Sequence, residues 1–119
     1  MNFLRNRKVM ENDAVMFDID DTLIFTNGQA NIPVIRLLYD AMQLGYKIII
    51  ITARPAFPIT LAFTKAQLKR YKIPYTRLYL TPAQNKGTLK RMTKLNYVLS
   101  VGDQPTDLTD TMYALKIVK

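Results

Sequence analysis

Three carboxylates follow an apolar run near the start of the chain. Residues 15–17 are apolar and lead directly into Asp18, and Asp20 and Asp21 come within the next three positions. Because only one residue separates Asp18 from Asp20, both side chains can reach one site once the strand gives way to a loop. Such concentrated negative charge is unfavourable unless a cation shares the site. The cluster therefore predicts a site for a metal ion, a phosphate group, or both.

Other polar residues occupy comparable positions further along the chain. Thr52 ends a run of four isoleucines, Lys86 and Lys90 precede a later apolar run, and Asp103 and Asp107 follow that run. Taken singly such residues are ordinary, since acids after strands are often turn or cap residues. In an open parallel sheet, however, the carboxyl ends of the strands border one crevice. In this order the residues are expected to converge on one site.

An alternation of strands and helices is needed to bring these residues together. Apolar runs predict strands at 14–19, 46–51, 76–80, 97–101 and 114–118. Helices are predicted between Asn31 and Gly45, at 58–71, after 81–82 and at 106–112. The alternation predicts an α/β fold with a central parallel sheet of about five strands, helices on both faces and right-handed crossovers.

The helix between Asn31 and Gly45 has the clearest signals. Asn31 can cap its N-terminus, Pro33 lies in its first turn and Gly45 can end it. Its predicted buried face comprises Ile32, Ile35, Leu38, Tyr39 and Met42. The apolar pattern of the helix 58–71 is less regular, and the residues expected to pack are Leu61, Ala62, Phe63, Ala66 and Leu68.

The composition narrows the chemistry. The chain has 119 residues and neither cysteine nor histidine, which excludes disulfides, a thiolate nucleophile and the usual nitrogen or sulfur metal ligands. A bound metal would then be a hard cation held by oxygen, which favours Mg²⁺. The length predicts one domain over 1–119, with a loose basic lead-in at 1–12.

The net charge of the chain indicates the kind of partner it binds, and its hydropathy indicates where in the cell it is located. The formal net charge of +8 suits an anionic partner, either a phosphorylated small molecule or nucleic acid. No apolar run is long enough for a membrane span, and the N-terminus lacks the apolar region of a secretory signal. Together with the absence of cysteine, this predicts a cytoplasmic protein. Tyr71, Tyr75 and Tyr79 are interpreted as packing residues rather than base-stacking residues.

The residues 14–107 resemble the haloacid dehalogenase superfamily of phosphohydrolases. Its first motif, hhhDxDxT, matches the segment 17–22, and its second, an apolar strand ending in Thr or Ser, matches 48–52. Its fourth, GDxxxD, matches 102–107, and its third, a lysine before the fourth strand, fits Lys86 best and Lys90 second. Within the superfamily the segments are most similar to the acid-phosphatase-like branch, and the short intervals between motifs predict an enzyme without a cap domain. The implied fold is three-layered and Rossmann-like.

The resemblance implies a mechanism. Asp18 would attack phosphorus to form an aspartyl-phosphate, and Asp20 would act as general acid and then general base. Mg²⁺ would be held by the Asp18 carboxylate, the Asp20 backbone carbonyl and Asp103, with Asp107 ligating the metal or orienting the lysine. Thr52 and Lys86 would stabilise the phosphoryl oxygens. Asp21 and Asp110 are interpreted as structural or solvent-facing.

Several functions are compatible with these residues, and three others fit less well. A broad-specificity phosphatase for small phosphate monoesters is the first expectation, and a phosphatase acting on nucleic-acid ends is the alternative. A phosphotransferase acting on an alcohol acceptor would show the same residues.

A receiver-type signalling domain fits less well, because its phosphorylated Asp lies at the end of the third strand, where this chain has 80–82, Leu-Thr-Pro. A non-catalytic phosphate-binding module would not need the full set of motif residues, and an EF-hand would need a central Gly and a final Glu.

Overall fold

The structure, a computed structural model, describes residues 2–118, and within them five parallel strands form one sheet in the order β3-β2-β1-β4-β5. The strands are β1 (Asp13–Phe17), β2 (Lys47–Thr52), β3 (Arg77–Leu80), β4 (Asn96–Gly102) and β5 (Tyr113–Lys116). The helices are α1 (Asn2–Arg5), α2 (Ile32–Gln43), α3 (Pro58–Arg70) and α4 (Lys86–Thr93), with 3₁₀ turns η1 (Ala83–Asn85) and η2 (Pro105–Asp107). Within residues 2–118, every helix is too short or too polar to cross a bilayer.

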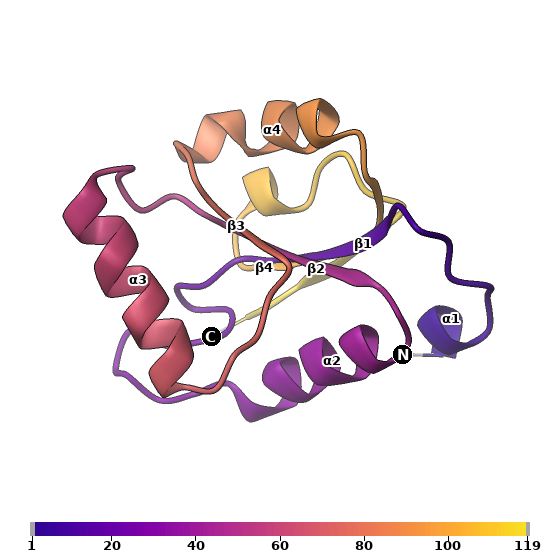
Figure 1. The fold of residues 1–119 in the computed structure, drawn as a ribbon, viewed down its shortest axis with the longest axis horizontal. Helices are drawn as coiled ribbons and strands as arrows, with labels where there is room; N and C mark the ends of the chain where they lie inside the picture. The colour runs from indigo at the N-terminus through magenta and orange to yellow at the C-terminus, as the bar shows by residue number, and fades with distance from the viewer. Residues whose placement is uncertain (1, 119) are drawn as a thin grey trace.

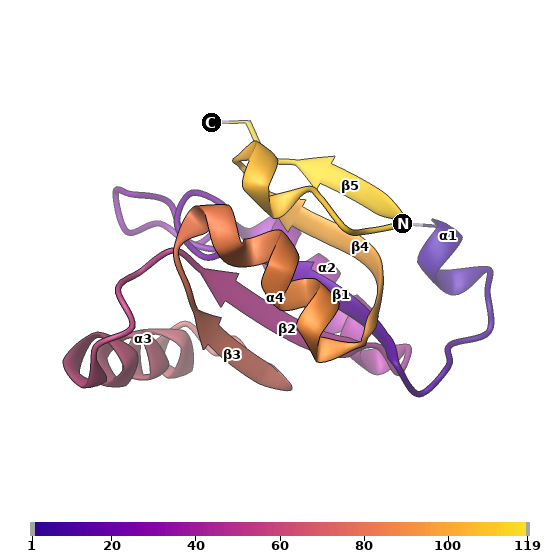
Figure 2. The same cartoon turned by 90° about the horizontal axis from the view of Figure 1, so that it is seen from above.

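Helices cover both faces of the sheet. α2 lies against one face and α4 against the other, and the two views place the sheet between them (Figures 1 and 2). Val15 and Phe17 of β1 face α2, whereas Ala14 and Met16 belong to the smaller cluster on the side of α4. The isoleucines of β2 divide in the same way. The predicted three-layer, Rossmann-like α/β fold with a central parallel sheet is therefore confirmed.

The side of α2 that packs differs from the predicted one. Its buried residues are Val34, Ile35, Leu37, Leu38 and Ala41. Two of the predicted residues are instead exposed, Ile32 at 50% and Tyr39 at 37%. Both sets have helical spacing, so spacing alone does not choose between them.

The residue before α2 also acts differently from its prediction. Asn31 does not cap the helix with its side chain, whose amide donates a 2.9 Å hydrogen bond to the carbonyl of Thr22. The carbonyl of Asn31 accepts the backbone N–H of Ile35. Asn31 therefore ties the loop after β1 to the start of α2.

α3 has nearly the predicted bounds but packs through fewer residues. Only Thr64 and Leu68 are buried. Of the other predicted packing residues, Leu61 is half-buried, while Ala62, Phe63 and Ala66 are exposed. α3 lies at the β3 edge of the molecule rather than over the centre of the sheet (Figures 1 and 2).

Two further predictions of local structure are wrong. The N-terminal segment is not a loose lead-in throughout, because α1 buries Leu4, whose carbonyl accepts a 2.8 Å hydrogen bond from the Tyr46 hydroxyl. The segment 106–112 forms only the turn η2 followed by bends. Asp110 adopts a φ of 55° there, which is incompatible with a right-handed helix.

A buried carboxylate ties the N-terminal segment to the sheet. Asp13, 2% exposed, accepts hydrogen bonds from Arg7 Nη1 at 3.0 Å, Met10 N–H at 2.8 Å and Asn96 Nδ2 at 2.8 Å. Burial alone would raise the pKa of Asp13, but these hydrogen bonds and the charge of Arg7 outweigh burial and lower it. Asp13 lies at the start of β1, away from the strand ends that carry the other acids.

Replacing Asp13 should destabilise the fold. We expect Asp13→Ala to lower the free energy of unfolding by about 1–3 kcal/mol at neutral pH, because it leaves buried donors unpaired. Since the pKa of Asp13 is lowered in the folded state, its contribution should be lost as pH falls below its ordinary value of 3.8. Denaturant unfolding at neutral and acidic pH measures both effects. Asp40→Ala, which removes the exposed 3.4 Å ion pair with Arg5, is the control and should change stability by about 0.5 kcal/mol or less.

Candidate active site

A cavity of about 300 Å³ lies at the carboxyl ends of the central strands. Its walls come from the connections after β1, β2, β3 and β4 and from the start of α4, and they carry acidic and basic side chains. Asp18, Asp20, Lys86 and Asp103 all line it. The structure therefore brings together residues that are far apart in the sequence, at the crevice where open α/β sheets bind ligands.

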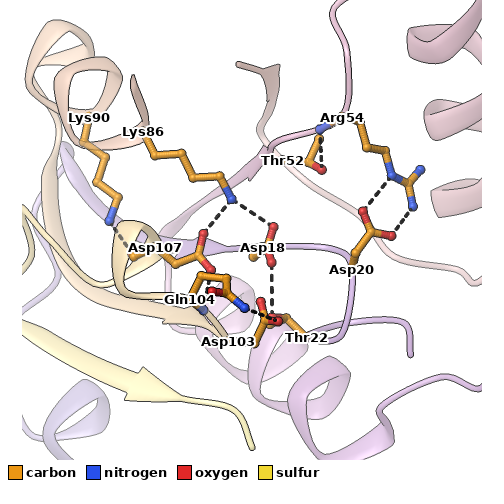
Figure 3. Close-up of polar contacts among 10 residues, drawn as sticks. All are labelled: Asp18, Asp20, Thr22, Thr52, Arg54, Lys86, Lys90, Asp103, Gln104 and Asp107. Atoms are coloured by element: carbon orange, nitrogen blue, oxygen red, sulfur yellow. Dashed lines mark hydrogen bonds and ion pairs between the residues drawn. The ribbon is translucent and has the colours of Figure 1, made fainter. Parts of the chain in front are cut away.

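Lys86 is the centre of this arrangement. Its Nζ lies 3.0 Å from Asp18 Oδ1 and 2.5 Å from Asp107 Oδ1, and all three side chains are at most 9% exposed (Figure 3). Burial lowers the pKa of Lys86, but the two carboxylates outweigh burial and raise it. Lys86 is thus a charged ammonium that bridges the end of β1 to the turn after β4.

Three carboxylates remain close enough to share a cation. Asp18, Asp103 and Asp107 each place one carboxylate oxygen within 4.8 Å of those of the other two. Lys86 neutralises only one of these three charges. A donor set of carboxylate oxygens in a partly buried site fits a hard divalent cation such as Mg²⁺.

The pKa of Asp18 is raised to about 7, mainly because the carboxyl group is buried. The ammonium of Lys86 opposes this shift, and the charge of Asp107 adds to it. The Thr22 hydroxyl donates a long 3.5 Å hydrogen bond to Asp18 Oδ2. A bound divalent cation would favour the ionised carboxylate, which is the form that can act as a nucleophile.

Asp20 has a different environment from Asp18. Its side chain is 59% exposed and forms a two-pronged ion pair with Arg54, at 3.1 Å from Nε and 2.9 Å from Nη2. In Figure 3 the Asp20 carboxylate points to Arg54 and away from Lys86. The three clustered carboxylates do not include Asp20. The Asp20 side chain therefore lies at the mouth of the cavity.

Sequence reasoning missed Arg54. In addition to its ion pair with Asp20, Arg54 donates a 3.1 Å hydrogen bond from Nη1 to Thr64 Oγ1. The guanidinium of Arg54 also lies 5.9 Å from the ring centre of Phe63. The available signal was a cation two residues after the end of β2, at the same edge of the sheet as Asp20. Arg54 joins the loop after β1 to α3.

Thr52 lies beside the cavity rather than in its lining. It is 0% exposed, and its hydroxyl accepts a long 3.4 Å hydrogen bond from the backbone N–H of Arg54 (Figure 3). Ala53 and Arg54, which follow it, line the cavity. Thr52 thus ends β2 next to the site, as its position in the sequence suggested.

Lys90, the second candidate lysine, contacts other groups than Lys86. Its Nζ donates to Ser100 Oγ at 2.9 Å and to the carbonyls of Asp107 and Thr109, both at 2.7 Å. Burial lowers its pKa to about 8, partly offset by Asp107 and Asp110. Lys90 thus holds the turn after β4 through backbone carbonyls, whereas Lys86 reaches Asp18. Sequence reasoning did not identify Ser100 or Thr109 as partners.

Gly102 allows Asp107 to take its position. A Cβ atom on Gly102 would lie 2.3 Å from the Cβ of Asp107, which is closer than real Cβ contacts. Asp107 is fully buried, and its Oδ2 accepts the backbone N–H of Gln104 at 3.1 Å. Position 102 therefore needs glycine for a steric reason, because any side chain there would clash with Asp107.

The remaining two acids serve local structure. Asp21, at a φ of 62°, accepts hydrogen bonds from the backbone N–H of Thr26 at 2.9 Å and from its hydroxyl at 2.8 Å. Asp110 accepts a 2.7 Å hydrogen bond from Arg91. The cluster of three carboxylates includes neither.

Comparison with known proteins agrees with this arrangement. A search of curated proteins found no match. A solved chain described as "Structure of Pnkp1/Rnl/Hen1 complex" superposes with a TM-score of 0.64 over 82% of this chain, at 22% identity. This chain covers 41% of that chain, and the likeness shows the fold alone. A family model described as "haloacid dehalogenase-like hydrolase" matches residues 15–93, which include Asp18, Thr52 and Lys86. The chain therefore belongs to the haloacid dehalogenase-like hydrolases.

Proposed function

We propose that this hydrolase is a Mg²⁺-dependent phosphatase that cleaves phosphate monoesters through an aspartyl-phosphate on Asp18. The observation that carries the proposal is the position of Lys86, buried between Asp18 and Asp107 with Asp103 close by. Such a site can neutralise a phosphate dianion next to a carboxylate nucleophile, which a purely structural ion pair would not require.

The reaction would take place in two steps. An oxygen of Asp18 forms a bond to phosphorus while the ester oxygen leaves and takes a proton from Asp20. Water then attacks phosphorus, gives its proton to Asp20 and releases Asp18 and inorganic phosphate. Mg²⁺ held by Asp18, Asp103, Asp107 and the Asp20 backbone carbonyl would supply charge that offsets the repulsion between carboxylate and phosphate. Lys86 and the Thr52 hydroxyl would stabilise the phosphoryl oxygens.

Arg54 would act as a positioning residue in this mechanism. Asp20 must exchange a proton with the leaving oxygen, which faces the mouth of the cavity when phosphorus is next to Asp18. The two-pronged pair with Arg54 keeps the Asp20 carboxylate at this mouth. A bidentate guanidinium restricts the orientation of a carboxylate more than an ammonium can.

The connections of the fold suggest an open site. Only the loop 18–31 separates β1 from α2, and only 81–85, which includes η1, separates β3 from α4. Neither leaves room for a cap domain. We therefore propose a capless enzyme of the acid-phosphatase-like type, with 1–119 acting as one catalytic domain. An open site admits small phosphate monoesters as well as phosphate groups at the end of larger molecules.

The first prediction concerns the nucleophile. Hydrolysis of para-nitrophenyl phosphate should require Mg²⁺, stop with EDTA and fall roughly 1,000-fold or more in Asp18→Asn, because the amide cannot form the covalent intermediate. Release of nitrophenolate measures the rate, and circular dichroism verifies the fold. Full activity of the folded Asp18→Asn protein would contradict the mechanism, and a folded wild type inactive on all monoesters would favour a binding role.

The second prediction concerns the metal. Asp103→Asn should weaken Mg²⁺ binding roughly tenfold or more, because it removes one charge from the cluster at close range. Asp110→Asn, which changes an acid paired with Arg91 outside the cluster, should leave the affinity unchanged. Calorimetric titration with Mg²⁺ measures both variants without any need for turnover. Equal affinities would place the ion elsewhere.

The third prediction concerns Arg54. Arg54→Lys should lower kcat/KM, which reports only the steps up to the aspartyl-phosphate, roughly tenfold for an alkyl phosphate, whose leaving oxygen needs a proton. The loss should be much smaller for para-nitrophenyl phosphate, whose leaving group needs none. Arg36→Lys, at an exposed position on α2, should change neither rate. An equal loss on both substrates would show that Arg54 supports the site in general rather than positioning Asp20.

A further inference from the structure

A second pocket opens beside the candidate active site, between α3 and the edge strand β3. Its volume is about 350 Å³, within the ~300–1,000 Å³ typical of small-ligand sites. It is lined mainly by apolar and aromatic side chains, among them Phe57, Pro58, Leu61, Leu78, Tyr79 and Leu80. The mechanism proposed above does not use these residues.

Two loops border both this pocket and the catalytic cavity. After β2, Ala53 and Arg54 line the cavity while Phe57 lines the pocket. Leu80 at the end of β3 lines the pocket, and Ala83 in the following connection lines the cavity. Three residues of chain place the Cα atoms of Arg54 and Phe57 at most about 11 Å apart. One substrate molecule can therefore have its phosphate at Asp18 and another part in the pocket.

The pocket offers aromatic and apolar side chains to such a part. Phe57 is 66% exposed although it is a large aromatic residue, and it directly precedes α3 as its N-cap residue. Tyr79 packs against the cluster on the side of α4, as predicted, and because it is only half-buried it also borders the pocket from β3. Exposed aromatic rings beside a positively charged surface are the usual means of binding the bases of single-stranded nucleic acid.

The charged residues of α3 and β3, between which the pocket lies, are all basic. Residues 41–102 contain 11 lysines and arginines and no aspartate or glutamate, so the positive charge of the chain is concentrated in this stretch. Arg77 Nη1 lies 3.4 Å from the hydroxyl of Tyr79 at the pocket, and Lys65 and Lys69 are exposed on α3. A single phosphate needs only the cations of the catalytic cavity. The additional cations along α3 and β3 suit a polyanion.

We propose that this pocket binds the terminal base of a single-stranded nucleic acid whose terminal phosphate is cleaved at Asp18. The inference rests on the proposed phosphatase function and names its substrate. Phe57 and Tyr79 would contact the base, while Arg77 and the exposed lysines of α3 would contact the phosphates of the following nucleotides.

Hydrolysis of matched substrates tests the proposal. The substrates are single-stranded oligonucleotides of about ten nucleotides with a phosphate at the 5′ or the 3′ end, the corresponding mononucleotides, and glycerol phosphate, which has no ring. We expect kcat/KM to be highest for an oligonucleotide. Phe57→Ala should lower that value roughly tenfold, the effect of losing one base–aromatic stack, and leave glycerol phosphate unchanged. Tyr113→Ala, at an exposed aromatic residue on the opposite edge strand, should change neither.

Binding without turnover gives a second, independent measurement. In EDTA, fluorescence anisotropy of a labelled oligonucleotide should show weaker binding to Phe57→Ala, and Arg77→Gln should reduce the slope of log affinity against log salt by about 0.7 per lost phosphate contact. If glycerol phosphate is hydrolysed but Phe57→Ala changes neither binding nor hydrolysis of the oligonucleotide, this inference alone is overturned. The same holds if mononucleotides and oligonucleotides have equal kcat/KM. Oligonucleotide binding that depends on Phe57, without hydrolysis of any monoester, overturns the phosphatase function instead.

Discussion

The buried ammonium of Lys86 is the interaction on which the candidate site depends. Three structural elements meet at its Nζ atom, which lies within 3.0 Å of carboxylates from the end of β1 and from η2 while its own backbone starts α4. Burying these charges is costly, and removing one partner of such a pair typically costs about 3–5 kcal/mol. The ion pairs therefore fix Asp18 and Asp107 with respect to each other, and the remaining charge of Asp18, Asp103 and Asp107 provides for a cation.

The sheet makes this arrangement rigid. The neighbouring strands β1, β2 and β4 are buried on both faces, and their carboxyl ends carry Asp18, Thr52 and Asp103 or lead directly into them. Lys90 adds a second buried cation, whose bonds to the carbonyls of Asp107 and Thr109 fix the turn after β4. The charged centre of the site thus rests on strands and buried charges.

The mouth of the site is built differently, at the β3 edge of the molecule. Asp20 is exposed and held by Arg54, which also contacts α3 through Thr64. α3 buries only two side chains and leaves Phe63 exposed, as is Phe57 just before the helix. The charged centre and this exposed edge are therefore distinct regions, and Arg54 connects them.

The sequence by itself determined the parallel α/β fold and the set of acids at the strand ends, because runs of apolar residues and the residues that follow them are local properties of the chain. The absence of cysteine and histidine likewise excluded thiolate and imidazole chemistry without any structure. Which face of α2 is buried could not be predicted, since two sets of residues share helical spacing. Lys86 and Lys90 lie one turn apart on the same side of α4, so only the tertiary positions of Asp18 and of the turn after β4 decide which carboxylate or carbonyl each lysine meets. The orientation of Asp20 toward Arg54 and the pocket between α3 and β3 likewise depend on contacts between segments distant in sequence, which no local pattern contains.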